Sequence, residues 1–249
     1  MNRDLILNLG LNPDAGETAF LSLDDDFVVL DTETTGLTAT AEIVELGLID
    51  SQGQPLIDTF VKPLKPIPAE ATAIHGITDE MVADAPTWPE VLGQLIRATE
   101  GKLVVIFNAG YDVRLLEQTT ALWGIDVPVE MASRGFYCAM LEYAAYKGVV
   151  NPLRRGYKWW KLGVAAEMEG VPPGTAHRAV GDCETTLGVI RAVQAKLRKN
   201  LEADHGVVQM VGADLAGDQH PCHHSECSVS GTGTGEGQQG VPGADLRPT

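Results

Sequence analysis

Four carboxylates and one histidine have the side-chain types and the spacing of a metal-assisted hydrolytic site. Asp31 and Glu33 follow an apolar run and stand two residues apart, so in an extended chain both point to the same side. Asp112 follows a second apolar run, and Asp182 comes five residues after His177 at the start of an expected helix. Strand ends and helix starts meet at one edge of an α/β sheet, where sites usually form. We therefore expect these side chains to gather in one place.

The chemistry of such a site follows from its ligands. Four carboxylates offer hard oxygen atoms, which suit Mg²⁺ or Mn²⁺ better than zinc. Two such ions about 4 Å apart can hold the attacking and the leaving oxygen of an in-line phosphoryl displacement. His177 is the candidate general base that would take a proton from the attacking water, a role that histidine fills most often. On one continuous helix His177 and Asp182 would point about 140° apart, so we place the histidine on the loop before that helix.

Each of these residues also has an ordinary structural interpretation. Asp31 and Glu33 could be turn acids, and Asp112 and Asp182 could begin helices, where acidic side chains are favoured. His177 could be a solvent-exposed loop histidine. The order of all five along the chain favours one catalytic site over five separate structural roles.

The predicted elements place these residues in an α/β domain. Strands are expected at 27–31, 43–50, 56–61, 103–107 and 135–137, and helices at 89–100, 112–123, 139–146, 162–169 and 180–199. The strands are short apolar runs, and the last helix has an apolar stripe on one side. The alternation of strands and helices after the third strand indicates the α/β fold class.

We expect three parts of the chain: 1–23 as an N-terminal extension, 24–200 as the folded domain and 201–249 as a flexible, acidic, glycine-rich tail. Residues 231–243 contain six glycines and no apolar period, which cannot form a core. Apolar residues make up 44% of the whole chain, which excludes wholesale disorder. No apolar run is long enough to cross a bilayer, no basic leader is visible, and the cysteines form no disulfide framework. A cytoplasmic location is therefore expected.

The charge distribution is compatible with a polyanionic partner. The whole chain has a net charge of −16, but residues 97–200 contain 14 basic and 10 acidic side chains. Within this part, the segment 146–161 holds five basic and four aromatic residues and no acid. Arg154, Arg155 and Lys158 are candidate contacts to phosphates or stacked bases. Alternatively, Trp159 packs in the core while the lysines solvate the outer face.

At four separated segments the sequence resembles the DEDD superfamily of 3′→5′ exonucleases, in the branch whose third motif uses histidine, like bacterial proofreading subunits. The matching segments are 31–36 (DTETTG), 108–116 (NAGYDVRLL) and 177–182 (HRAVGD), and 75–78 (HGIT) is similar to a further segment between the first two motifs. The resemblance covers about residues 26–195. Many relatives have histidine where this chain has Phe107, and the tail lacks an obvious counterpart of the polymerase-binding segment of proofreading subunits.

The resemblance implies a ribonuclease H-like fold, with a mixed five-stranded sheet flanked by helices, and two bound Mg²⁺ or Mn²⁺ ions. It implies hydrolysis at the 3′ end of single-stranded DNA with release of nucleoside 5′-monophosphates. By position, the metal ligands would be Asp31, Glu33, Asp112 and Asp182, with His177 as the general base. The candidate substrate contacts are Thr34, Thr35, Gly36, His75, Asn108, Arg154, Arg155 and Lys158. His75 could alternatively pack beneath the edge of the site.

Two other functions remain open from the sequence. An exoribonuclease acting on short RNA would keep the same chemistry, since no motif reads the 2′-hydroxyl. A non-catalytic module would use the fold to hold single strands or a replication partner. Loss of one of the five catalytic positions would have favoured the module, and all five are present. By the same resemblance, a DNA polymerase is a candidate partner.

Overall fold

The computed structural model describes residues 19–126, 133–153, 156–175 and 177–215. The chain divides into two units, Met1–His205 and Gly206–Thr249. The first unit holds a sheet and the helices that pack on it, and in the second unit residues 206–215 are helical. No helix within these described ranges is long and apolar enough to span a membrane.

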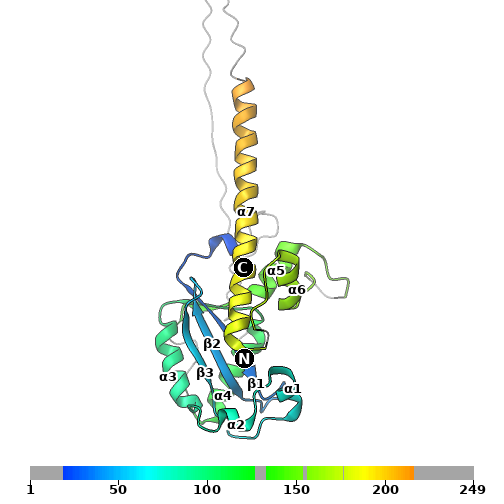
Figure 1. The fold of residues 1–249 in the computed structure, drawn as a ribbon. Coiled ribbons are helices and arrows are strands. Elements are labelled where there is room, and N and C mark those ends of the chain that lie inside the picture. Colours follow the sequence, from blue (N-terminus) through cyan, green and yellow to red (C-terminus); the bar gives the residue numbers. More distant parts are fainter. Residues whose placement is uncertain (1–18, 127–132, 154–155, 176, 216–249) are drawn as a thin grey trace, which may run out of the picture. The chain divides into compact units, whose positions relative to one another are not determined.

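Five strands form one mixed sheet (Figure 1). They are β1 (Phe27–Thr34), β2 (Ile43–Asp50), β3 (Pro55–Phe60), β4 (Leu103–Ile106) and β5 (Gly135–Cys138). Their order across the sheet is β3-β2-β1-β4-β5. The pairs β1–β2 and β2–β3 are antiparallel, whereas β1–β4 and β4–β5 are parallel. The predicted mixed five-stranded sheet flanked by helices is therefore confirmed.

The helices follow the predicted order but differ at some ends. They are α1 (Ala69–His75), α2 (Asp79–Val82), α3 (Trp88–Thr99), α4 (Ala109–Leu122), α5 (Ala139–Lys147), α6 (Leu162–Glu169) and α7 (Ala179–Leu215). The short helices α1 and α2 are absent from the prediction, because so few residues show no apolar period. Helix α7 continues past residue 199, where we expected it to end, because neither proline nor paired glycines interrupt residues 200–215.

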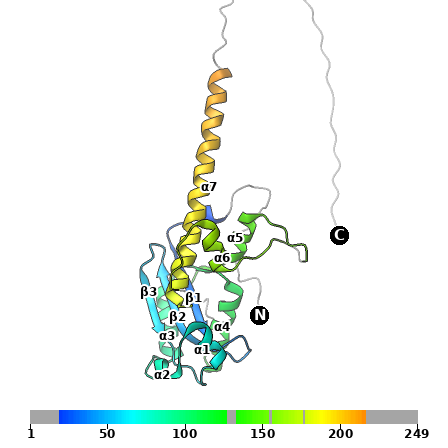
Figure 2. The same ribbon diagram turned by 45° about the vertical axis from the view of Figure 1, so that its right-hand side comes forward.

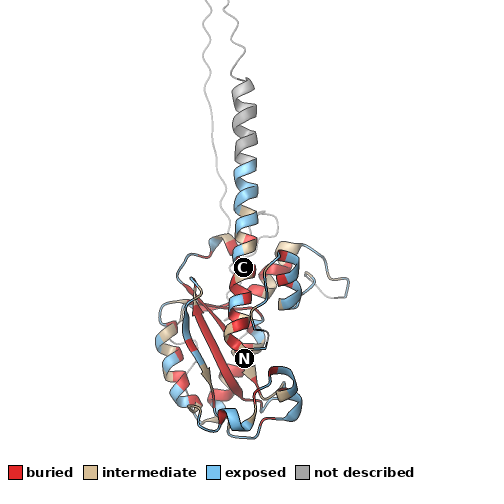
Figure 3. Ribbon diagram, in the orientation of Figure 1, coloured by how far each residue is buried: buried red, intermediate tan, exposed pale blue. Residues whose placement is uncertain are grey.

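Helices cover both faces of the sheet (Figures 1 and 2). On one face α3 and α4 pack through residues such as Trp88 and Leu115 against Val28 of β1. On the other face α5, α6 and α7 pack against Val29, the next residue of the same strand, with Ile190 of α7 fully buried. Figure 3 shows the buried residues concentrated along the strands. Neighbouring β1 residues thus belong to opposite cores, as the alternation of a strand requires.

The segment just before β1 adds to the second of these cores. A short 3₁₀ helix spans Ala19–Ser22, and Phe20 is fully buried against the helices of that face. The carbonyl of Phe20 accepts a 2.7 Å hydrogen bond from Nε2 of Gln194 in α7. Residues 19–23, which lie in the expected N-terminal extension, therefore contribute to the packed unit.

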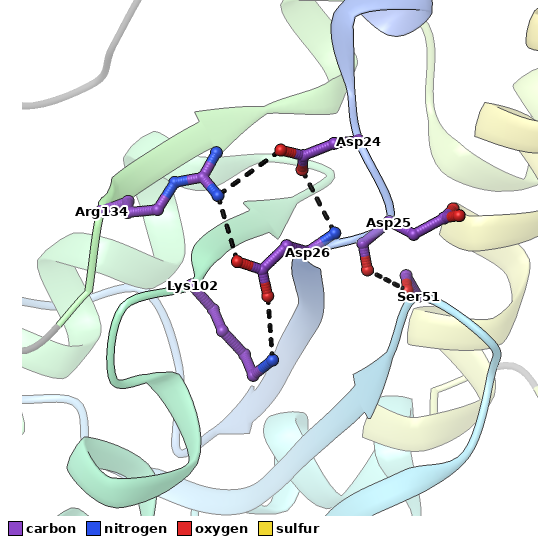
Figure 4. A network of polar contacts seen from close by, with 6 residues as sticks. All are labelled: Asp24, Asp25, Asp26, Ser51, Lys102 and Arg134. Atoms are coloured by element: carbon purple, nitrogen blue, oxygen red, sulfur yellow. Dashed lines mark hydrogen bonds and ion pairs between the residues drawn. The ribbon is translucent and has the colours of Figure 1, made fainter.

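Ion pairs join the beginnings of the three parallel strands (Figure 4). Nζ of Lys102 lies 3.1 Å from Oδ1 of Asp26, and Nη1 of Arg134 lies 3.4 Å from Oδ2 of Asp26 and 3.7 Å from Oδ2 of Asp24. Asp26, Lys102 and Arg134 immediately precede β1, β4 and β5. Exposed pairs contribute little to stability, so these contacts mainly align the strand starts. The opposite ends of the parallel strands lead into the candidate site.

Candidate active site

Two of the predicted ligands lie in the last part of β1, which continues to Thr34 rather than ending at residue 31 as we expected. Asp31 and Glu33 are both half-buried. Val29, two residues before Asp31, belongs to the core beneath α7, so Asp31 and Glu33 face that helix. Gly36, with a φ of 140°, lets the chain turn away after the strand. The two carboxylates thus share one face of the sheet.

The other two predicted ligands begin helices. Asp112 is in the first turn of α4 and is 4% exposed, and its Oδ1 accepts a 2.7 Å hydrogen bond from Oγ1 of Thr32. Asp182 is half-buried in the first turn of α7, where its backbone N–H donates to the carbonyl of Arg178. The amino-terminal end of a helix dipole favours negative charge at both positions. Both acids lie at the helix starts that the spacing predicts.

His177 is exposed in the turn that leads into α7, on the loop where the spacing places it. Its φ of 58° is a left-handed conformation that residues with a Cβ atom seldom adopt. A ring nitrogen of His177 and a carboxylate oxygen from each of Glu33 and Asp182 all lie within 4.8 Å of one another. The end of β1 and the start of α7 therefore bring three predicted residues into contact range of one ion.

Burial raises the pKa of all four carboxylates, and the charges of neighbouring carboxylates add to this effect at Asp31 and Glu33. Burial and then the neighbouring carboxylate charges, Asp112 first, raise the pKa of Asp31 well above its usual range. Burial and the charge of Asp182 raise the pKa of Glu33 to about 8. Burial raises the pKa of Asp112 to about 7, although the hydrogen bond from Thr32 opposes the increase. The cluster therefore resists its full negative charge unless a cation compensates it.

The donor set fits a hard divalent cation. Carboxylate oxygens, with one imidazole beside them, are ligands that Mg²⁺ and Mn²⁺ accept. Cys183 follows Asp182 in the chain but offers no soft ligand, because it is buried and its Sγ donates to the carbonyl of Gly47 at 3.5 Å. The described site thus has the chemistry of an oxygen-rich metal site.

A cavity of about 600 Å³ adjoins the carboxylates and has the size of a small-molecule site. Its wall includes Glu33 together with five of the predicted substrate contacts, Thr34, Thr35, Gly36, His75 and Asn108. The exposed side chains of Leu37 and Ile74 add apolar surface to the same wall. The cavity therefore offers apolar surface for a flat ring system and polar groups beside the acidic cluster.

His75 lies in the wall of this cavity with both ring nitrogens engaged. It is 7% exposed, its Nδ1 accepts a 3.0 Å hydrogen bond from the backbone N–H of Ile77, and its Nε2 lies 3.3 Å from the carbonyl of Thr34. Since Nδ1 accepts, the proton is on Nε2, which donates to Thr34. Burial lowers the pKa of His75, so the ring stays neutral. His75 therefore both packs beneath the site and lines the cavity.

Among the described residues, no predicted basic contact lies in the cavity wall. Arg154 and Arg155 lie outside those residues. Lys158 is exposed, its Nζ lies 4.0 Å from the centroid of the Trp160 ring, and it is not part of the cavity wall. Trp159, which could have packed in the core, is 54% exposed. A substrate contact by any of the three basic residues stays a prediction.

Tyr111 is a site residue that the sequence interpretation missed. Its hydroxyl lies 2.7 Å from Oγ1 of Thr34 and donates to the carbonyl of Gly36 at 3.1 Å. These bonds tie α4 to the turn that follows β1 and forms part of the cavity wall. Its position directly before Asp112 was a signal that could have drawn attention to it.

Phe107, at the position where many of the resembling enzymes have histidine, is not part of the cavity wall. It is 6% exposed and belongs to the core beneath α5, α6 and α7. Its carbonyl lies 3.6 Å from Sγ of Cys138. In this chain the position therefore supports the core, and the cavity wall is supplied by the next residue, Asn108.

Comparison with known proteins gives consistent matches. Residues 28–190 match the family described as RNase_T: Exonuclease. The chain is 53% identical over 175 residues to the uncharacterized exonuclease CP81 of Escherichia phage 186, covering 69% of this chain and 89% of the phage protein. It is 31% identical over 208 residues to the DNA polymerase III subunit epsilon-like protein of Rhodobacter capsulatus, covering 78% of this chain but only 28% of that protein.

A solved structure confirms the expected ribonuclease H-like exonuclease fold. The nuclease domain of 3′hExo, described as a DEDDh family member bound to rAMP, has a TM-score of 0.57 and 18% sequence identity, covering 70% of this chain and 94% of that one. At 18% identity, this similarity is evidence for the fold alone. The family match contains all five predicted catalytic positions and most of the sheet. The chain therefore belongs to the RNase_T family of exonucleases.

Proposed function

We propose that the protein is a metal-dependent 3′→5′ exonuclease that acts on single-stranded DNA and releases nucleoside 5′-monophosphates. The observation that carries the proposal is the meeting of Glu33, His177 and Asp182 within 4.8 Å, beside a cavity of about 600 Å³. Asp31 and Asp112 complete the acidic cluster. Burial raises the pKa of both carboxyls, and the charge of Asp112 further raises the pKa of Asp31.

The proposed metal ligands are Asp31, Glu33, Asp112 and Asp182, which would hold two Mg²⁺ or Mn²⁺ ions. When bound, such ions stabilise the charge on the attacking and leaving oxygens of an in-line displacement at phosphorus.

The exposed His177 would take a proton from the water that attacks the last phosphodiester. The bond from phosphorus to the 3′ oxygen of the preceding nucleotide breaks. The phosphate then leaves with the terminal nucleoside, and the shortened strand gains a 3′-hydroxyl.

The cavity is the proposed place for the terminal nucleotide. Leu37 and Ile74 present apolar side chains that suit the face of a base. Thr35 and Asn108 present polar groups on the same wall. A nucleotide held there would lie beside Glu33, which lines both the cavity and the acidic cluster.

DNA is the favoured substrate, and RNA is the second candidate. The Rhodobacter relative is named as a DNA polymerase III subunit epsilon-like protein, which supports DNA. The structurally similar 3′hExo domain is described as bound to rAMP, which supports a test of RNA. A DNA polymerase partner and a cytoplasmic location stay predictions from the sequence, as does the alternative of a non-catalytic binding module.

The test uses two 5′-labelled single strands of the same base sequence, one DNA and one RNA, incubated in Mg²⁺ and in EDTA. The variants are Asp182→Ala, His177→Ala and Glu184→Ala. Glu184 is the matched control, because it is an exposed acid of α7 two residues beyond Asp182. We expect a ladder that shortens from the 3′ end, requires Mg²⁺ and persists in Glu184→Ala.

Asp182→Ala should abolish this ladder, and His177→Ala should slow it by roughly 10²–10⁴-fold, the usual contribution of general-base catalysis. The strand that shortens faster identifies the substrate class. Intact strands in every reaction, from protein shown to be folded, would reject the exonuclease assignment. Retention of an oligonucleotide in Ca²⁺ by such a protein would then favour the binding module.

A further inference from the structure

Strand β2 lies directly beside the carboxylates of β1. In the antiparallel pairing, Glu45 is opposite Glu33, and Gly47 is opposite Asp31. Opposite residues of paired strands point to the same face of a sheet. Glu45 and Gly47 therefore face the beginning of α7, as the two predicted ligands do.

Both carboxylate oxygens of Glu45 are engaged, and its side chain is 1% exposed. Oε1 accepts hydrogen bonds from Nε and Nη2 of Arg178 at 2.9 and 2.6 Å, and Oε2 accepts one from the backbone N–H of Ala179 at 3.1 Å. The guanidinium also lies 5.2 Å from the centre of the Phe60 ring. Because its oxygens are already used, Glu45 is better suited to anchor α7 than to act as a fifth metal ligand.

Gly47 allows the helix to rest directly on the strand. A Cβ atom at this position would lie 2.6 Å from backbone atoms of Ala179 and Val180, closer than real Cβ contacts. The bond from Sγ of Cys183 to the carbonyl of Gly47 adds a contact one turn further along α7. Gly47 and Glu45 thus hold the start of α7 against β2. In the sheet these two residues lie opposite Asp31 and Glu33.

His177 immediately precedes this anchored segment. Its φ of 58° is unfavourable, and such conformations persist only where the surrounding structure enforces them. The next two residues, Arg178 and Ala179, are the ones that bind Glu45. The anchor therefore fixes the backbone from which the imidazole projects, and one turn later the same helix carries Asp182.

We infer that Glu45 and Arg178 form a positioning pair, which holds His177 and Asp182 in place beside Glu33. The inference rests on the proposed function, because it assigns the pair a task in that same site. Arg178 acts through the backbone that it anchors. Its planar guanidinium places two donors on one carboxylate oxygen, a geometry that the single ammonium of lysine does not reproduce.

The first test compares Arg178→Gln and Arg178→Lys with Arg198→Gln, a matched control because Arg198 is an exposed arginine of the same helix. On the labelled strand, we expect kcat to fall on the order of 10–100-fold in Arg178→Gln, the effect of a displaced catalytic group. KM should change by less than about threefold, because the cavity wall is untouched. Arg178→Lys should recover part of kcat, and Arg198→Gln should match the unsubstituted protein.

Thermal unfolding is measured for every variant, because Arg178→Gln leaves the buried Glu45 without its charged partner. Should that variant not fold, Arg178→Lys keeps the charge and carries the test. A folded Arg178→Lys protein with unchanged kcat would argue against the positioning pair.

A second readout needs no nuclease activity. Mn²⁺ is titrated into each protein by calorimetry without nucleic acid, and we expect several-fold weaker binding in Arg178→Lys than in Arg198→Gln. If the unsubstituted protein shortens no strand, the proposed function fails, while weaker Mn²⁺ binding in Arg178→Lys would still support the pair. Unchanged Mn²⁺ binding together with unchanged kcat in folded Arg178→Lys would overturn the inference.

Discussion

The hydroxyl of Thr32 donates a 2.7 Å hydrogen bond to Oδ1 of Asp112, which lies 80 residues further along the chain. Both residues are buried, and Thr32 stands between Asp31 and Glu33 in β1. The strand therefore supplies two candidate ligands from one face and, from the other, a hydrogen bond that orients a third. This arrangement makes β1 the element on which most of the site depends.

Replacing Thr32 by valine keeps the branched shape and removes only the hydrogen bond to Asp112. We expect Thr32→Val to lower activity by about 10–100-fold and to require more Mg²⁺ for half-maximal rate, because groups that orient metal ligands have effects of this size. Thr32→Ser keeps the hydroxyl and should retain most of the activity. Initial rates over a series of Mg²⁺ concentrations provide the measurement. A valine variant with the Mg²⁺ dependence of the serine variant would contradict the prediction.

Tyr111→Phe removes the hydroxyl that bonds to Thr34 and Gly36 in the cavity wall. We expect KM for the oligonucleotide to rise about fivefold, equivalent to ~1 kcal/mol for one hydrogen bond, with a smaller change in kcat. Tyr143→Phe is the matched control, since its hydroxyl donates to Glu169 at 2.8 Å and Tyr143 is not part of the cavity wall. The control should lower the melting temperature and leave KM unchanged. Equal KM values in both variants would show that the Tyr111 hydroxyl does not shape the pocket.

Much of the fold could be predicted because its strands are local patterns. The apolar run before Asp31 indicates a strand, but the polar residues after it resemble a turn. Pairing with β2, in which Thr34 lies opposite Ile43, extends β1 beyond that run. Helix α1 was missed because it has seven residues, and its end at Gly76 depends on a left-handed cap rather than on a periodic pattern.

The predicted site residues could be found because each stands at the end of a recognisable element. Their supporting partners could not, since those depend on contacts between distant segments. Arg178 and Glu45 are 133 positions apart, and no local pattern marks Glu45 as a partner of α7. The position of Lys158 relative to the cavity could not be predicted either. The run of basic residues in the segment 146–161 indicates charge but not where that charge lies in the fold.

The environment of Glu169 leads to a prediction about acid stability. Its side chain is 1% exposed and accepts hydrogen bonds from Tyr143 at 2.8 Å, Lys196 at 2.6 Å and Lys147 at 3.4 Å. Burial raises the pKa of Glu169, but these partners outweigh it and lower the pKa below 4.5. A carboxyl with a lowered folded-state pKa stabilises the fold above its ordinary pKa and loses this effect as the pH falls through the folded value.

We therefore expect Glu169→Gln to destabilise the protein at pH 7 by about 2 kcal/mol, the scale for hydrogen bonds to a charged group. The difference in melting temperature between the two proteins should narrow below about pH 4, as Glu169 is protonated. Thermal unfolding of both proteins at a series of pH values measures this difference in melting temperature. A difference that stays constant down to pH 3 would mean that the charge of Glu169 contributes nothing.

The acidic cluster predicts the opposite pH dependence. In the metal-free fold the pKa of Asp112 is raised to about 7 and that of Glu33 to about 8, from ordinary values of 3.8 and 4.5. Between about pH 4 and pH 8 the folded protein therefore keeps protons that the unfolded chain has released. Folding is linked to proton binding in this range, so stability in EDTA should fall as the pH rises through it.

Asp112→Asn tests this relation, because it removes one charge and keeps an oxygen that can accept the hydrogen bond from Thr32. In EDTA at pH 8 we expect the variant to melt roughly 2–8 °C above the unsubstituted protein, the shift for a few kcal/mol in a chain of this size. At pH 5 the two should melt at nearly the same temperature. Added Mg²⁺ should raise the melting temperature of the unsubstituted protein more than that of the inactive variant. If Asp112→Asn instead lowers the melting temperature in EDTA at pH 8, the buried charge of Asp112 does not destabilise the metal-free fold as its raised pKa requires.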